Sequence, residues 1–166
     1  MRLIIHDLNK EEAAVAFENL KQESTVFVTP KKDVMACTGC FGCWFKTPGQ
    51  CVIEDDYNGM GDLIAKCGTL TLVTRNCFGS QSPLVKSLLD RSISYVSPLF
   101  TIRHKRMHHK NRHKNKLIYE VCFYGDATLR EQKTAEELVK AQAINLNAVS
   151  HKVLFLNDHH QIKGAL

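Results

Sequence analysis

The chain has 166 residues, of which 44% are hydrophobic and 23% charged, with seven cysteines and a formal net charge of +5. This length and composition favour one globular domain over residues 1–166, and no apolar run approaches the ~18 residues of a membrane-spanning helix. The positive charge is local, because residues 103–116, RHKRMHHKNRHKNK, carry seven Lys or Arg and no acidic residue.

Short apolar and β-branched runs alternate with helical patterns along the chain. The runs predict strands at residues 2–6, 24–28, 69–74, 117–124 and 152–156. Capping-box patterns at Asn9 with Glu12 and at Thr128 with Glu131 each predict the start of a helix. Ser82 followed by Pro83 predicts a third helix, which we expect to end by Pro98. A further helix is expected from Asp56 or Asn58 to Cys67, before Gly68.

Strands that alternate with helices predict a parallel sheet with right-handed crossovers and helices on both faces. Five strands in a chain of this length favour a three-layer α/β/α sandwich with the flavodoxin-like strand order 2-1-3-4-5. Sheets of this kind bind ligands at the carboxyl ends of their strands. We therefore expect the loops after the first, third and fourth strands to converge on one site.

A cysteine-rich loop, residues 37–56, has the sequence CTGCFGCWFKTPGQCVIEDD. Its four cysteines are spaced C-x2-C-x2-C-x7-C, and thiolates are ligands that suit iron–sulfur clusters, zinc and copper(I). Three cysteines at successive gaps of two residues match the spacing of the bacterial ferredoxin run. Zinc, reactive thiols and a loop whose thiols hold nothing remain alternatives. The remaining cysteines, which lie in apolar surroundings and are predicted to be core residues, are Cys67, Cys77 and Cys122.

The N-terminal residues MRLIIHDLNKEE lack the pattern of a secretory signal, which predicts a cytoplasmic protein with reduced thiols and no membrane partner. The basic segment 103–116 has no clear periodicity and is predicted to be a loop, solvated or at a subunit interface. Its histidine pairs 104/108 and 109/113 have the spacing of a helical metal site, which is an alternative. Nucleic acid is not a favoured partner, because no stacking aromatics are interleaved in the segment.

The motifs CTGCFGCW…GQCVIEDD and FGSQSPLVKSLLDR resemble the flavodoxin-like family of NADPH-dependent FMN reductases and iron–sulfur flavoproteins. The resemblance covers residues 37–91, about a third of the chain. It implies an oxidoreductase that uses NADPH as electron donor, with a small-molecule or protein electron acceptor, and by analogy a homodimer. It implies FMN on the loops that follow the third and fourth strands, at Arg75, Asn76, Phe78, Gly79, Ser80, Tyr124, Gly125 and Asp126. It implies a 4Fe-4S cluster on Cys37, Cys40, Cys43 and Cys51.

The first loop departs from this family pattern. The family has a longer Ser/Gly/Asn-rich turn that binds the FMN phosphate at a helix N-terminus. Here only residues 6–8 separate the strand from Asn9, and carboxylates stand where the phosphate should lie, at Asp7, Glu11 and Glu12. A divergent protein without flavin, acting as a metal- or thiol-binding module, is therefore the alternative function. A third is an anion- or RNA-binding protein that uses the basic segment, whose Arg and Lys side chains are also candidates for phosphate contacts to FMN or NADPH.

Overall fold

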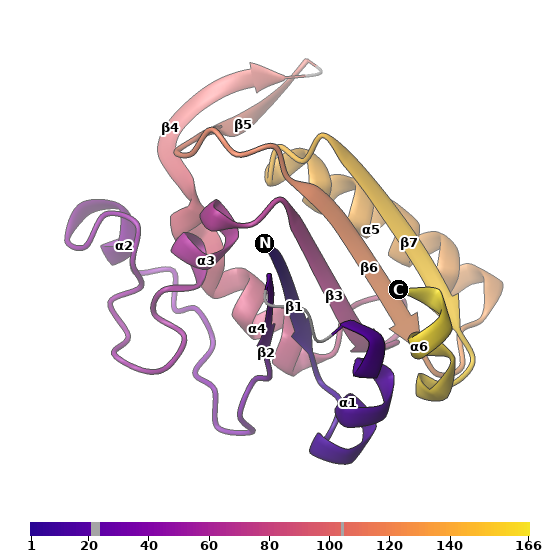
Figure 1. Ribbon diagram of the computed structural model, residues 1–166. Coiled ribbons are helices and arrows are strands. Elements are labelled where there is room, and N and C mark those ends of the chain that lie inside the picture. The colour runs from indigo at the N-terminus through magenta and orange to yellow at the C-terminus, as the bar shows by residue number, and fades with distance from the viewer. Residues whose placement is uncertain (21–23, 104) are drawn as a thin grey trace.

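The computed structural model describes residues 1–20, 24–103 and 105–166, arranged as Figure 1 shows. Its main sheet has five parallel strands in the order β2-β1-β3-β6-β7. Counted along the chain within this sheet, that is the predicted order 2-1-3-4-5. Ile5 of the central β1 is paired with Val28 on one side and Leu72 on the other. The strands of the main sheet are β1 (Arg2–His6), β2 (Thr25–Val28), β3 (Thr69–Arg75), β6 (Ile118–Tyr124) and β7 (Ser150–Leu156).

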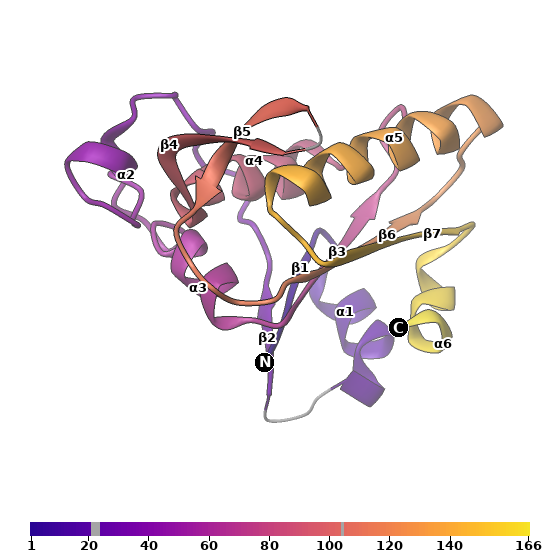
Figure 2. The same cartoon turned by 90° about the horizontal axis from the view of Figure 1, so that it is seen from above.

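Alternate residues of each strand face opposite sides of this sheet, and each side is covered by helices (Figure 2). Leu3 and Ile5 belong to the larger core, beneath α3, α4 and α5. Ile4 belongs to the smaller core, with Phe17 after α1 and Ile162 of α6. Two buried faces explain why the strand sequences are continuously apolar. The helices are α1 (Lys10–Ala16), α2 (Gly42–Phe45), α3 (Met60–Lys66), α4 (Pro83–Arg91), α5 (Leu129–Asn145) and α6 (Ile162–Ala165), with 3-10 turns η1 (Glu18–Leu20), η2 (Ser92–Tyr95) and η3 (His159–Gln161).

Three of the four predicted helix starts are confirmed by the caps. The start at Asp56 or Asn58 is wrong, because α3 begins at Met60 with Gly59 at the cap position and no side-chain cap. Both capping boxes form, at Asn9 with Glu12 and at Thr128 with Glu131. The side chain of Ser82 accepts a hydrogen bond from the backbone of Val85, with Pro83 at the first helical position. The α4 helix ends at Arg91, well before Pro98, because the chain tightens into the η2 turn.

The prediction of a loop at residues 103–116 is wrong for most of the segment. Strand β4 (Val96–Arg103) pairs with β5 (Arg106–Asn111) in an antiparallel hairpin separate from the main sheet. The hairpin lies at the top of Figure 1, away from the arrowheads of the main sheet. The hairpin shows no strand-like alternation of buried and exposed residues in the sequence, because several of its apolar side chains are solvent-exposed, among them Leu99, Ile102 and Met107. His104 lies outside the described residues, and the i, i+4 spacing of His109 and His113 is not helical.

The C-terminal residues form η3 and α6. Ile162 is fully buried and anchors α6 against α1. Within the described residues no helix combines the length and the hydropathy needed to cross a membrane.

Candidate functional site

The loops after β1, β3 and β6 converge at the carboxyl edge of the sheet, as predicted. The backbone N–H of Asn76 donates to the carbonyl oxygen of Tyr124 at 2.9 Å. The side-chain amide of Asn76 donates to the carbonyl oxygen of Asp126, also at 2.9 Å. These bonds join the β3 and β6 loops into one surface. This edge is the position at which doubly wound sheets bind their ligands.

The carboxylate of Asp7 ties the β1 loop to both neighbouring loops. Its Oδ2 accepts hydrogen bonds from the hydroxyl of Thr74 at 3.2 Å and from the backbone N–H of Arg75 at 3.1 Å. Its Oδ1 accepts from the hydroxyl of Tyr124 at 2.9 Å. Burial and then the negative charge of Asp7 raise the pKa of Tyr124 above its ordinary value, which keeps that phenol protonated. An internal anion therefore fills the junction of the three loops.

The N-terminus of α1, directly after Asp7, is also satisfied internally. The Asn9 side chain accepts hydrogen bonds from the backbone N–H groups of Glu11 and Glu12, both at 2.9 Å. The Glu12 carboxylate accepts from the backbone N–H of Asn9, also at 2.9 Å. A phosphate group does not fit this loop, because its donors are occupied and three carboxylates surround it.

The loop after β3 presents an aromatic ring to solvent. Cys77 and Ser80 exchange two backbone hydrogen bonds across a tight turn, at 2.9 and 3.0 Å. Phe78 and Gly79 occupy the turn with φ of 56° and 82°, and Phe78 is 89% exposed. A positive φ is uncommon for a residue with a bulky side chain. Gly79 is required, because a Cβ there would lie 2.7 Å from the carbonyl oxygen of Glu131.

The other residues predicted to bind the cofactor surround this turn. Arg75 and Asp126 are exposed, Ser80 is half-buried, and Gly125 has φ of 91°. Tyr124 is buried and bound to Asp7, so its hydroxyl is occupied. The predicted set is therefore gathered at one edge, with Phe78 and Arg75 as its most exposed large side chains.

The four cysteines of the 37–56 loop lie elsewhere, around a pocket of about 690 Å³. The walls of this pocket come from the cysteine loop, the hairpin and the C-terminal halves of α4 and α5. None of the described residues 75–80 or 124–126 lines it. The helix α4 separates the two places, since its nine residues span about 13 Å. Within the part of the chain that the structure describes, the thiol pocket and the strand ends are therefore two separate places.

A buried ion pair fixes the returning part of the cysteine loop. Arg91 at the end of α4 is fully buried and forms a two-point pair with the Asp55 carboxylate, one contact at 2.7 Å. A further bond, 3.2 Å long, joins Arg91 to the carbonyl oxygen of Ile53. Hydrogen bonding to Arg91 lowers the pKa of Asp55 below its ordinary value. Cys51 is held against the pocket wall by this anchor two residues away.

The side chain of Trp44 covers the cysteine loop. Its indole N–H donates to the carbonyl oxygen of Val96 at 3.0 Å. Its ring stacks on Phe41 at 5.5 Å and contacts the ring of His109 at 4.8 Å. These contacts attach the cysteine loop to the base of the hairpin.

The thiols differ in environment. A hydrogen bond from the backbone of Gly42 lowers the pKa of the exposed Cys40. Burial, and then the neighbouring thiols of Cys51, Cys37 and Cys40, raise the pKa of Cys43. Cys67 and Cys122 are buried, as predicted, and burial raises their pKa values to about 11 and about 12.

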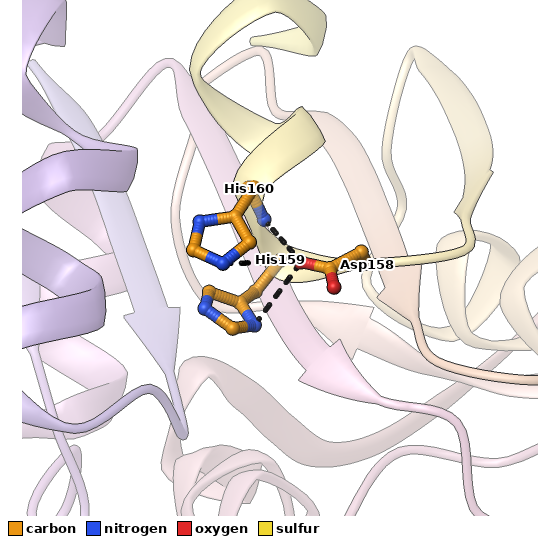
Figure 3. A group of neighbouring side chains, drawn as sticks. All are labelled: Asp158, His159 and His160. Atoms are coloured by element: carbon orange, nitrogen blue, oxygen red, sulfur yellow. Dashed lines mark hydrogen bonds and ion pairs between the residues drawn. The ribbon is translucent and has the colours of Figure 1, made fainter.

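Among the described residues, ligand atoms of three or more metal-binding side chains come within 4.8 Å of one another at Asp158, His159 and His160 (Figure 3). Among the described residues, no three of the four loop cysteines have sulfur atoms this close together. The charges of the other three nevertheless contribute, after burial, to the raised pKa of Cys43. The sequence analysis did not single out Asp158, His159 and His160. The only available signal was the run of three potential ligands.

The basic hairpin side chains do not reach the strand-end site. Arg103 bonds to Asn147 and to the carbonyl oxygen of His109, and Arg112 bonds to the carbonyl oxygen of Ser94. The β4–β5 hairpin lies at the opposite end of the main sheet from the strand arrowheads (Figure 1). Phosphate contacts from this hairpin to a ligand at the carboxyl edge of the same chain are therefore not supported.

Comparison with known proteins shows similarity at the level of structure. No protein-family model matches the sequence, and no curated protein matches it. Solved structures match over nearly the whole chain. An FMN-dependent NADH-azoreductase from Bacillus anthracis, in complex with FMN, is 11% identical with a TM-score of 0.57, covering 98% of this chain and 92% of its own.

Two further structures have the same architecture. NAD(P)H:quinone oxidoreductase from Methanothermobacter marburgensis is 8% identical with a TM-score of 0.58, covering 99% of this chain and 96% of its own. Trp repressor binding protein from Bacillus subtilis is 10% identical with a TM-score of 0.56, covering 99% and 92%. At these identities the likeness shows a shared fold.

The thiol environments predict an order of chemical reactivity. At pH 8 we expect iodoacetamide to modify Cys40 more than about tenfold faster than Cys122, because the thiolate is the reactive form and Cys40 is exposed with a lowered pKa. Alkylation of the native protein followed over time by peptide mass spectrometry measures both rates. Modification of Cys40 no faster than that of buried Cys43 would contradict this assignment.

Proposed function

We propose that this chain, which has the flavodoxin-like fold, is an oxidoreductase that seats a flavin ring on the loops after β3 and β6. The observation that carries the proposal is the ring of Phe78, held outward by a tight turn and 89% exposed at the edge where this fold binds ligands. An exposed aromatic ring on a constrained backbone is suited to stack on a planar ligand.

The residues present fit the flavin ring and not the phosphate of FMN. Phe78 offers a stacking face, and the exposed guanidinium of Arg75 offers a donor beside it. The turn residues, Gly79, Ser80, Gly125 and Asp126, would border the ring. Asp7 and the capped N-terminus of α1 exclude a phosphate from its usual place. A bound flavin supplies two-electron exchange with a nicotinamide donor, and this chain supplies position and charge.

The electron donor and the electron acceptor are also part of this proposal. The structural neighbours named above include an NADH-dependent and an NAD(P)H-dependent enzyme, which supports a nicotinamide donor for this chain. NADPH is the donor that the sequence resemblance implies, and a quinone or another small molecule is the proposed acceptor. The homodimer and the cytoplasmic location stay predictions.

Replacing Phe78 with Ala should weaken flavin binding about tenfold, because the stacking face is lost. Titration of riboflavin and FMN fluorescence with the full-length protein measures the affinity. Phe45→Ala is the matched control, since Phe45 is also an exposed phenylalanine, at 74%, but lies in the cysteine loop. The proposal would be wrong if the wild-type protein binds no flavin, or if Phe78→Ala and Phe45→Ala bind flavin with equal affinity.

A second candidate function is favoured by the thiol pocket. Cys37, Cys40, Cys43 and Cys51 all line it, and burial, followed by the charge of the other three thiols, raises the pKa of Cys43. Four thiolates are the ligand set of a 4Fe-4S cluster, whose irons separate the sulfurs more widely than a single ion does. The donor set therefore fits a cluster better than one zinc ion, and the chain would then carry electrons or act as a metal-binding module.

Protein purified without oxygen should show a broad brown absorption and about four irons per chain if this pocket holds a cluster. Cys43→Ser should abolish both, because Cys43 is the buried one of the four thiols that line the pocket. Cys77→Ser, at the strand-end turn, should leave them unchanged. Iron-free, colourless protein would exclude the cluster without affecting the flavin proposal.

A further inference from the structure

The segment after β7 places three metal-binding side chains together, away from the thiol pocket and next to the strand-end site, where the ring of His159 lies 6.3 Å from that of Tyr124. Asp158 caps the η3 turn, and His159 and His160 are its first two residues. Figure 3 shows the two imidazole rings side by side, next to the Asp158 carboxylate. Their ring centroids are 4.1 Å apart. Neither the flavin proposal nor the thiol proposal uses these residues.

The three ligand atoms lie within 4.8 Å of one another, which is close to the spacing around a small tetrahedral ion. The Oδ1 atom of Asp158 lies 3.3 Å from Nδ1 of His159 and 3.9 Å from Nε2 of His160. Two ligands bonded to zinc at 2.0 to 2.1 Å with a tetrahedral angle are about 3.4 Å apart. The first separation already has this value, and the second needs to shorten by about half an ångström.

The carboxylate of this group is fixed in place. The Oδ1 atom of Asp158 accepts a hydrogen bond from the backbone N–H of His160 at 2.7 Å. The cap therefore orients one ligand before any ion arrives.

A second carboxylate faces the opposite side of the His159 ring. Nε2 of His159 lies 3.9 Å from Oε1 of Glu12, and the other oxygen of Glu12 is held by the backbone N–H of Asn9. Histidines that bind a metal through one nitrogen commonly direct the other toward a carboxylate, which fixes the tautomer. The pairing of Glu12 with His159 has this arrangement.

We propose that Asp158, His159 and His160 bind a divalent transition-metal ion, with zinc as the ion of choice, and that Glu12 orients His159. Two imidazole ligands out of three favour zinc, copper and nickel over magnesium and calcium. Three protein ligands leave a fourth position for water or an anion. The ion would also link the C-terminal segment to α1, because Glu12 belongs to that helix.

The test is zinc titration of the full-length protein against a competing chelator, which gives affinity and the number of ions per chain. His160→Ala should remove one bound zinc per chain, whether or not the thiols hold another. Glu12→Gln should weaken this zinc about 10- to 100-fold, because glutamine preserves the capping box but not the carboxylate beside His159.

His151→Ala and Cys40→Ser are the controls, since His151 is an exposed histidine on β7 and Cys40 belongs to the thiol pocket. Both should retain the zinc that His160→Ala loses. Equal numbers of bound ions in wild-type and His160→Ala protein would overturn the proposal. So would loss of the ion in Cys40→Ser alone. Circular dichroism of each variant confirms that the fold is kept.

Discussion

The carboxylate of Asp7 is the interaction on which the arrangement of the carboxyl edge depends. This side chain from the β1 loop accepts hydrogen bonds from a hydroxyl and a backbone N–H of β3 and from a phenol hydroxyl of β6. Hydrogen bonds to a charged group contribute roughly 1.5 to 3 kcal/mol each. Parallel strands bring these groups together, and the carboxylate holds the loops in one arrangement. The edge therefore contains its own anion at the switch point of the sheet.

The side chains that could carry chemistry lie in two separate places. The strand-end loops present the ring of Phe78, and the thiols line a pocket beyond the far end of α4. Arg91 and Asp55 anchor that pocket to α4, so its position is set by the same helix that begins beside the strand ends. Within one chain the proposed flavin site and the thiol pocket are separate. The proposed zinc site is a third, beside α1.

Much of the fold could be predicted from the sequence, because its signals are local. The apolar runs, both capping boxes and the Ser82-Pro83 start determined the element order, and the order determined the topology. The convergence of the three loops followed from the parallel sheet. The capped, acidic first loop was also visible, since Asp7 and Glu12 stand in the sequence where a phosphate loop would be.

The rest of the fold and of the candidate sites depends on long-range contacts, which the spacing of residues in the sequence does not reveal. The cysteine loop connects β2 to α3, and only the Arg91–Asp55 and Trp44–Val96 contacts decide which end of α4 it approaches. The hairpin escaped prediction because its apolar and basic side chains are both exposed. The grouping of His159 with His160 depends on the η3 turn, which a three-residue pattern does not specify.

The central claim is that Asp7 takes the place of a ligand phosphate, so the site recognises a flavin by its ring. The most direct test is the ratio of FMN to riboflavin affinity in wild-type and Asp7→Asn protein. We expect the wild-type protein to bind riboflavin at least as tightly as FMN. Removing the negative charge should shift the ratio about tenfold toward FMN. A wild-type preference for FMN that Asp7→Asn leaves unchanged would contradict the account.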